Sequence, residues 1–536
     1  MNDTKETQVE QHKTYSRRQR DDKGASHFEQ ADNRQVQALE EGKRPRRFRL
    51  GAAHHFQILL LSIVLTLLTV VLPYMTSLAT DYQQFNLYTG TLMTKNQLPY
   101  SDIFATGGFL FYALIGISQI LGSQLYLLGV QFLALYVAGI YLYKIVFFYT
   151  DDTASSMAAG LAFYLGNLAL GFGGLYPMQW AAPFVLMGLW FLIRYFAGMT
   201  KDEGFILYGL HAALALVLES KTLVFWLLAY VLLSGYNLSK KRFARGFYQN
   251  LAIILGLILV FYTVGYFVFN LEVTIPYLTQ VLGYNFTHLA WGTGILWQTA
   301  LLQVGLAFFS GLLLGALVFF EHIRKAERDY LSRVLIFLSL LAYVTLAVMS
   351  KSWAFYQLLP ALPFGLILTI ISLDGFEKQR QSRKNSHRRR EDERSLWGTF
   401  LFSHLAGPVL LVLVAVALPF YQRMTETARD DERVVLASYL KENTADAEKV
   451  VVIDDKADVY LLSGRRTATH YPVASLYQTS EDKIKEFEDD FLGSQSKFVI
   501  VNKSLTLSQS VKDSLAKNYD QMTFEGLEHF ALYQLK

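Results

Sequence analysis

The chain has 536 residues, 52% of them hydrophobic and 15% aromatic, and its mean hydropathy is +0.25. This composition is typical of an integral membrane protein. A net charge of +4, with basic residues in short clusters, does not indicate nucleic-acid binding, and the lack of Cys excludes disulfides, thiolate metal sites and a cysteine nucleophile.

Residues 1–50 are polar and charged, so they are predicted to form a disordered cytoplasmic tail. A basic cluster at 43–49 precedes the first apolar run and predicts a cytoplasmic N-terminus. That run begins near Phe56 and is too long for a signal peptide, so it is predicted to be an uncleaved first span.

Residues 51–421 are predicted to form a mainly α, polytopic bundle of about 11–13 membrane segments. Basic stretches at 240–245, 321–333 and 378–394 should be cytoplasmic. The predicted segments after the first span are 104–122, 125–148, 153–172, 176–196, a hairpin over 204–236, 248–270, 293–320, 334–350, 353–373 and 398–421.

The orientation rule conflicts with four complete crossings between 104 and 196, because Arg194 and Lys201 would then lie outside. We expect the Gly-rich segment 153–172 to be non-helical and not to cross completely. The alternative is that Arg194 and Lys201 depart from a statistical rule.

Residues 422–536 are soluble in character and are predicted to form a small extracytoplasmic α/β domain. The predicted strands cover 450–453, 498–502 and 530–535, and 434–442 is an amphipathic helix. The sequence contains no P-loop, dinucleotide-binding or HExxH motif.

Asp81 is the main candidate for chemistry, because it directly follows the first span. A carboxylate that is partly desolvated there can accept a proton from a hydroxyl group. The alternative is that Asp81 caps the next short helix.

Charged and aromatic residues near the other spans are candidates for binding a donor or an acceptor. Cations suit a phosphate group and aromatic rings suit a sugar, whereas snorkelling, capping and interfacial belts are the structural alternatives. These candidates are Asp102, Glu219, Lys221, Tyr284, His288, Lys351 and Tyr356. No spacing predicts a metal site or a cofactor, although Asp81 and Asp102 together could bind a divalent metal.

Several motifs occur in a fixed order: the acid at Asp81, Pro99-Tyr100-Ser101-Asp102, the Lys in the short hairpin, and Tyr356 before Leu358-Leu359-Pro360. In this order the chain resembles the GT-C superfamily of membrane glycosyltransferases. The similarity is to the bacterial branch of protein mannosyltransferases and the lipid A aminoarabinose transferase, and it covers roughly residues 56–536.

The resemblance implies sugar transfer from a polyprenyl-phosphate donor to a surface glycan or lipid-linked acceptor, with inversion and with Asp81 as the base. It implies that Lys221 and Lys351 stabilise the phosphate and that Tyr356 positions the donor. The sequence departs from the family at Ala105-Thr106-Gly107-Gly108, which lacks a basic residue, at Gln179, where some relatives carry an acid, and at Phe355.

The sequence therefore predicts a multi-pass cell-membrane glycosyltransferase that acts on a wall polysaccharide or teichoic acid. A transporter of polyprenyl-linked glycans is an alternative, although the chain lacks two similar halves. A non-catalytic cell-wall assembly protein is a further alternative.

Overall fold

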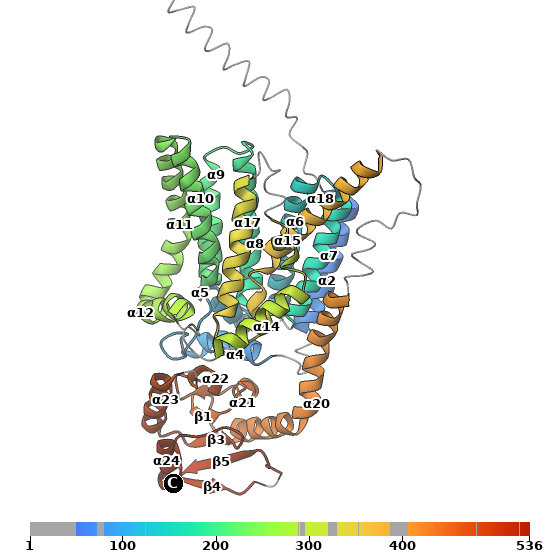
Figure 1. The fold of residues 1–536 in the computed structure, drawn as a ribbon. Helices are drawn as coiled ribbons and strands as arrows, with labels where there is room; N and C mark the ends of the chain where they lie inside the picture. Colours follow the sequence, from blue (N-terminus) through green and yellow to red (C-terminus); the bar gives the residue numbers. More distant parts are fainter. Residues whose placement is uncertain are drawn as a thin grey trace, which may run out of the picture. The chain divides into compact units, whose positions relative to one another are not determined.

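The computed structural model describes residues 50–71, 80–123, 125–172, 174–287, 289, 295–319, 330–351, 353–385, 406–478, 480–524 and 526–536. The predicted cytoplasmic tail and His288 lie outside these ranges. Most of the described residues are helical, and a small sheet forms only after residue 448 (Figure 1). The predicted mainly α membrane bundle with a small C-terminal α/β domain is therefore confirmed.

The bundle contains long apolar helices that are joined by short turns and one-turn helices. Their bounds are α2 (Ala52–Thr66), η1 (Leu67–Val71), α4 (Asp81–Leu92), η2 (Met93–Lys95), α5 (Phe109–Ile120), α6 (Leu125–Thr150), α7 (Thr153–Leu170), α8 (Pro177–Phe196), α9 (Gly204–Leu218), η3 (Ser220–Thr222), α10 (Leu223–Ser239), α11 (Phe243–Asn270), α12 (Thr274–Tyr277), η4 (Leu278–Tyr284), α13 (Asn285–Thr287), α14 (Ile295–Phe309), α15 (Leu314–Leu317), α17 (Tyr330–Val348), η5 (Phe355–Leu358), α18 (Leu362–Asn385) and α20 (Ala406–Asn443).

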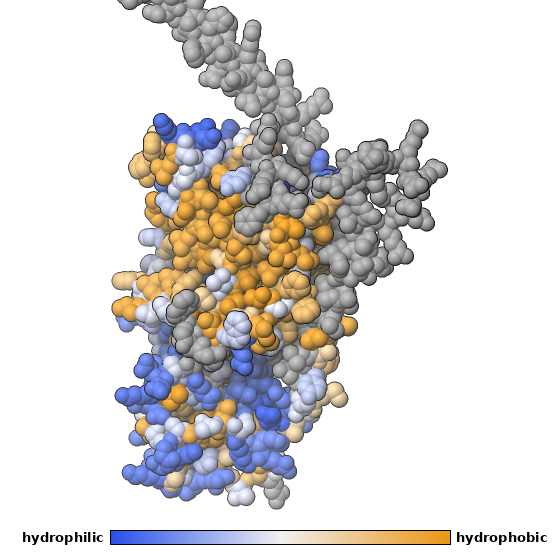
Figure 2. All heavy atoms as spheres, in the orientation of Figure 1, coloured by the Kyte–Doolittle hydropathy of each residue, from blue (hydrophilic) through white to orange (hydrophobic). Residues whose placement is uncertain are grey.

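Five stretches of the described chain are long and apolar enough to cross a membrane, over 52–70, 125–150, 220–239, 243–270 and 330–348, and three shorter apolar helices accompany them. Figure 2 shows their apolar side chains as a broad band over the bundle, with hydrophilic residues beyond it on both sides. Exposed aromatic and aliphatic side chains of α11, such as Ile258 and Phe261, contribute to this surface. The chain is thus a multi-pass membrane protein.

The expectation that 153–172 departs from a helix is wrong. Residues Thr153–Leu170 form the continuous helix α7, because Asp152 caps its first turn by accepting hydrogen bonds from the amides of Ala154 and Ser155. The short segment in this region is α5, which has 12 residues and follows an irregular stretch at 104–108. The hairpin predicted over 204–236 is confirmed, with Glu219 at the bend between α9 and η3.

The C-terminal domain contains a five-stranded sheet with the order β2-β1-β3-β5-β4. Strand β1 pairs in parallel with β2 and β3, whereas β5 pairs antiparallel with β3 and β4. The strands are β1 (Lys449–Ile453), β2 (Arg466–Thr467), β3 (Phe498–Asn502), β4 (Tyr519–Met522) and β5 (Phe530–Leu535), and the helices are α21 (Asp458–Ser463), α22 (Ala474–Tyr477), α23 (Glu481–Ser494) and α24 (Gln509–Asn518). The three predicted strands are confirmed, and β2 and β4 are additional.

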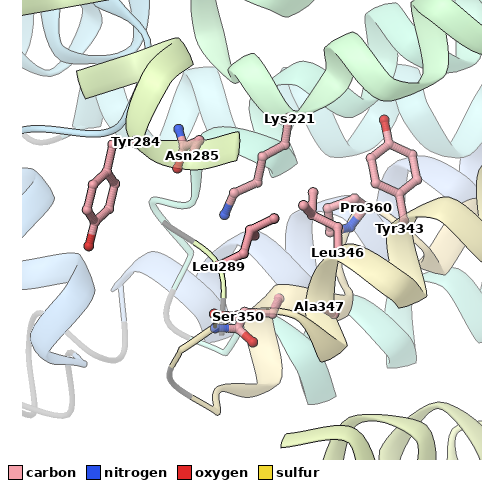
Figure 3. A pocket seen from close by; sticks show the side chains of 10 residues that line it. Lys221, Tyr284, Asn285, Leu289, Tyr343, Leu346, Ala347, Ser350 and Pro360 are labelled. Carbon is pink, nitrogen blue, oxygen red and sulfur yellow. Dashed lines mark hydrogen bonds between the residues drawn. The ribbon is translucent and has the colours of Figure 1, made fainter. Parts of the chain in front are cut away.

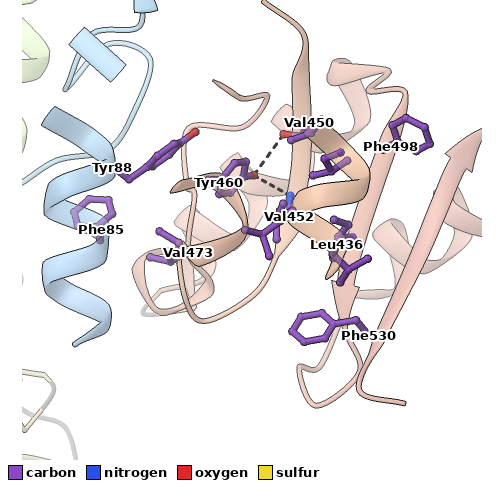
Figure 4. Close-up of a cluster of buried hydrophobic side chains, with 14 of the residues drawn as sticks. Phe85, Tyr88, Leu436, Val450, Val452, Tyr460, Val473, Phe498 and Phe530 are labelled. Atoms are coloured by element: carbon purple, nitrogen blue, oxygen red, sulfur yellow. Dashed lines mark hydrogen bonds between the residues drawn. The ribbon is translucent and has the colours of Figure 1, made fainter. Parts of the chain in front are cut away.

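Helix α4 connects the bundle to this domain. On one face, the side-chain amides of Gln83 and Asn86 donate to the carbonyls of Gly174 and Leu175, at 2.6 Å and 3.2 Å. On another face, Phe85 and Tyr88 belong to the buried core of the C-terminal domain, where the Tyr88 ring lies 5.0 Å from that of Tyr460 (Figure 4). The residues that follow the first span are therefore held from both sides.

Candidate functional site

Asp81 is the first residue of α4, and the cap of this helix leaves its carboxylate free. Thr80 is the cap: its hydroxyl accepts from the amide of Gln83, and the Gln83 side chain accepts from the amide of Thr80 at 2.7 Å. The alternative in which Asp81 caps the helix is therefore wrong. Asp81 is solvent-exposed, and its carboxylate forms no hydrogen bond within the described part of the chain.

The electrostatic environment of Asp81 comes largely from the C-terminal domain. Although the residue is exposed, neighbouring protein displaces part of the water around its carboxylate, which raises the pKa of Asp81 above the ordinary value. The ammonium of Lys456 opposes this increase, while Glu426 adds to it. A carboxylate with a raised pKa is a stronger base than one in bulk water.

Three tyrosines from separate parts of the bundle form a parallel cluster next to Asp81. The Tyr356 ring lies 4.7 Å from that of Tyr82 and 5.0 Å from that of Tyr176, with interplanar angles of 14° and 22°. The Tyr176 hydroxyl is 3.3 Å from the Thr80 hydroxyl, so the cluster reaches the residue next to Asp81. Because the three rings stack on one another, they fix the position of Tyr82 and Tyr356 next to Asp81.

The tip of the α9–α10 hairpin lies close to this tyrosine cluster. Glu219 is buried there and is close enough to Tyr82 and Tyr356 for its charge to act on both phenols. Its carboxylate accepts from the amide of Lys221 at 3.1 Å, which fixes the first turn of η3. The Lys221 ammonium makes no hydrogen bond to the described residues and remains available for a ligand.

A pocket of about 490 Å³, its open mouth included, begins at Lys221. Figure 3 shows the Lys221 side chain extending into it between Asn285 and Leu289. Apolar residues of α17 and the Pro360 turn form much of the remaining wall. A single cation in a partly apolar pocket is suited to an anionic lipid head group.

Hydrogen bonds hold the pocket wall in place. The side-chain amide of Asn285 donates to the carbonyl of Thr106 at 3.1 Å and to the Ser220 hydroxyl at 3.0 Å. The Gln357 amide donates to the Ser350 hydroxyl at 2.7 Å. Asn285 thereby links the segment before α5 to the hairpin tip, and Gln357 links η5 to the segment that follows α17, on another part of the same wall.

Lys483, from the C-terminal domain, lies against the outer side of this wall. Its ammonium is 3.8 Å from the ring centroids of both Phe104 and Tyr284, and Tyr284 also lines the pocket. Burial lowers the pKa of Lys483 to about 8, Glu486 opposes this decrease, and Lys351 adds to it. Lys351 is thus near the same wall.

The candidate Asp102, and Gln179, where some relatives carry an acid, have different surroundings. The Asp102 carboxylate accepts from the amide of Leu98 at 2.7 Å and closes the turn before Ile103, away from the pocket. Gln179 is buried and accepts from Gln131 at 3.1 Å, so it belongs to the interior of the bundle. The structure therefore brings together Asp81, Glu219, Lys221, Tyr284 and Tyr356, with Lys351 nearby.

Within the described ranges, no group of three or more His, Asp or Glu side chains is arranged to hold a metal ion. The sequence did not predict four residues that lie at or near the site: Tyr82, Tyr176, Lys456 and Lys483. Tyr82 directly follows Asp81 and Tyr176 directly precedes α8 in the sequence. Only the fold shows that their two rings stack on each other. No signal in the sequence relates Lys456 or Lys483 to a site hundreds of residues earlier.

Comparison with known proteins supports the fold. A family model described as "Putative competence-induced protein Ccs4 N-terminal domain" matches residues 43–427, and the corresponding "Ccs4 C-terminal domain" matches 430–536. No curated protein sequence matches the chain.

Two solved structures are similar over most of the chain. One is ArnT from Cupriavidus metallidurans bound to undecaprenyl phosphate, with a TM-score of 0.53 and 9% identity over 89% of this chain and 97% of that one. The other is the archaeal oligosaccharyltransferase AglB from Archaeoglobus fulgidus, with a TM-score of 0.45 and 12% identity over 90% of this chain and 74% of that one. The likeness to ArnT confirms, at the level of the fold, the predicted resemblance to GT-C membrane glycosyltransferases.

Proposed function

The chain belongs to the family of putative competence-induced Ccs4 proteins, and we propose that it is an inverting glycosyltransferase with Asp81 as its general base. The donor is a polyprenyl-phosphate-linked sugar, and the acceptor is a cell-surface glycan such as a wall polysaccharide or teichoic acid, or a lipid-linked glycan. Transfer takes place on the outer face of the membrane, with the C-terminal domain on the same side.

The observation that carries this proposal is the arrangement of Asp81, the tyrosine cluster and Lys221. The carboxylate has no hydrogen-bond partner in the described chain, the ring of the adjacent Tyr82 stacks on that of Tyr356, and Gln357, next to Tyr356, lines the pocket that Lys221 enters. These neighbouring groups support the assignment of a base, a contact for the sugar and a cation for the phosphate. The fold shared with ArnT, which is solved with undecaprenyl phosphate, supports the choice of donor.

The proposed reaction needs one base and no general acid. The acceptor hydroxyl gives its proton to the Asp81 carboxylate while its oxygen forms a bond to the anomeric carbon. The bond from that carbon to the phosphate oxygen breaks on the opposite face, so the configuration inverts. The phosphate leaves with the bonding electrons, and the Lys221 ammonium stabilises the negative charge that develops on it.

The test of the base is Asp81→Asn in the full chain, reconstituted in lipid nanodiscs. The assay offers a panel of undecaprenyl-phosphate-linked hexoses and N-acetylhexosamines together with cell-envelope extract, and measures sugar incorporated into polymer. We expect kcat to fall by about 10²- to 10⁴-fold, because a positioned base contributes that much. Asp489→Asn, an exposed acid on α23, should keep the wild-type rate.

If the Asp81→Asn protein transferred sugar at the wild-type rate, Asp81 would not be the general base. A wild-type protein that moves these lipids across vesicles without transferring sugar would favour the transporter. A wild type that neither transfers sugar nor moves lipid would favour the assembly protein.

The test of the phosphate contact is Lys221→Gln. We expect the rate of transfer to fall by about 10²- to 10³-fold, because a cation beside the leaving group acts mainly in the transition state. Lys240→Gln is a matched control, since Lys240 is exposed at the other end of α10. Equal losses from both variants would indicate a general effect on the hairpin and not a contact with phosphate.

A further inference from the structure

The C-terminal domain takes part of its core from the segment that carries Asp81. Its sheet is covered on one face by a cluster that includes Phe85, Tyr88 and Leu92 of α4, and on the other by a cluster that includes Phe104. The Tyr88 hydroxyl also donates to the carbonyl of Arg465 at 3.1 Å. Helix α4 is therefore fixed to this domain by packing as well as by hydrogen bonds.

The segment after the carboxyl end of β1 packs against α4: Ala457 belongs to the same buried cluster as Phe85, which lies one helical turn after Asp81, and Tyr460 stacks on Tyr88. In a parallel sheet, ligands and functional side chains gather at the carboxyl ends of the strands, at the point where the chain connections turn to opposite sides. Strand β1 lies at this point, because its parallel neighbours β2 and β3 are on opposite sides of it. The segment that leaves it, Asp454–Asp458, carries four charged residues.

This segment is anchored by a buried ion pair. The Arg433 guanidinium donates to the Asp454 carboxylate at 2.7 Å and 3.0 Å, and neither side chain is exposed to solvent. The Asn502 side-chain amide donates to the same carboxylate at 2.7 Å. The backbone that precedes Lys456 is thus held by α20 and β3 together.

The Lys456 ammonium is itself fixed. It lies 2.5 Å from the Glu426 carboxylate and 3.4 Å from that of Asp430, and its side chain is only 14% exposed. The charged groups of the domain that act on Asp81 from this side are Glu426 and Arg433 of α20, and Asp454, Asp455, Lys456 and Asp458 after β1, while Asp430 faces Lys456. On the bundle side, the titratable neighbours of Asp81 are Tyr82 and Tyr176.

We propose that Lys456 is a positioning residue for Asp81, so that the C-terminal domain forms one wall of the catalytic centre. This inference rests on the proposed function. Lys456 and Asp81 act on each other through their charges: the ammonium opposes the increase that burial causes in the pKa of Asp81. Without Lys456, the carboxylate would take up a proton at a higher pH and stop accepting one from the acceptor.

The experiment compares wild type, Lys456→Gln and Lys456→Arg in nanodiscs, with the undecaprenyl-phosphate sugar that gives the highest transfer. The readout is kcat as a function of pH. For Lys456→Gln we expect the acid limb to move to higher pH, which lowers kcat by about 3- to 10-fold on that limb and leaves the plateau and the donor KM in place. Lys456→Arg keeps the positive charge, so the acid limb of its kcat should lie at the wild-type pH.

Two further variants separate this effect from folding. Glu426→Gln removes a negative neighbour of Asp81 and should move the acid limb in the opposite direction, to lower pH. Lys512→Gln, an exposed Lys on α24, should change nothing. Limbs that stay in place for both Lys456→Gln and Glu426→Gln, or a loss that is equal at all pH values, would overturn the inference.

The two proposals can fail separately. If Asp81→Asn retains full transfer, the proposed function fails. If Asp81→Asn loses transfer while the acid limb of Lys456→Gln stays at the wild-type position, only the role of Lys456 fails.

Discussion

Gly108 shows how one small residue can shape the site. A Cβ atom built at Gly108 would lie 2.1 Å from the carbonyl oxygen of Val217, and the Gly108 amide donates to the carbonyl of Leu218 at 3.0 Å. The segment before α5 therefore passes directly against the end of α9, next to Glu219. In the sequence, this stretch is notable only as a departure from the related family, because it lacks a basic residue.

Gly108→Ala should displace the hairpin tip and, with it, Lys221. Overpacking of this kind costs about 1–3 kcal/mol, so we expect a lower thermal midpoint in detergent and a lower rate of transfer. Gly235→Ala is the control, because a Cβ at this helical position in α10 meets no atom within 4 Å. A Gly108→Ala protein as stable and active as Gly235→Ala would contradict the role of this contact.

Helix α4 was expected as a short helix after the first span, but its packing against two parts of the molecule could not be predicted from the sequence. Its faces are both buried: Gln83 and Asn86 meet backbone carbonyls of the bundle, while Phe85 and Tyr88 enter the core of the C-terminal domain. Burial of polar and apolar residues together removes the amphipathic pattern that reveals most surface helices. Strands β1 and β3 of the C-terminal domain, by contrast, are short Val- and Ile-rich runs, and β5 is a short run with apolar and aromatic residues, so these three strands could be predicted.

The ion pair between Arg433 and Asp454 joins α20 to the end of β1, and its contribution to stability can be tested. Arg433→Met leaves the Asp454 carboxylate buried without its cation, which typically costs about 3–5 kcal/mol. We expect the C-terminal domain of the full chain to become sensitive to limited proteolysis at a lower temperature. The double variant Arg433→Met/Asp454→Leu should recover part of that loss, and an equal loss from the single and double variants would contradict it.

At the scale of the whole molecule, the sequence was sufficient for the class of the fold but not for the composition of the site. Apolar runs predict the membrane bundle, and the change of composition near residue 422 predicts a second domain. A single helix, α20, nevertheless runs from 406 to 443 through this boundary. Contacts such as Tyr88 with Arg465 join residues 377 positions apart, and no local pattern encodes them.

The late position of the C-terminal domain in the chain has a consequence for biosynthesis. Helix α4 is made early, but the side chains that enclose it lie between residues 426 and 532, so a ribosome must complete nearly the whole chain before they exist. Until then, Phe85, Tyr88 and Leu92 lack the core into which they pack. A chain that ends before residue 426 therefore lacks both the packing partners of these residues and the charged groups that act on Asp81.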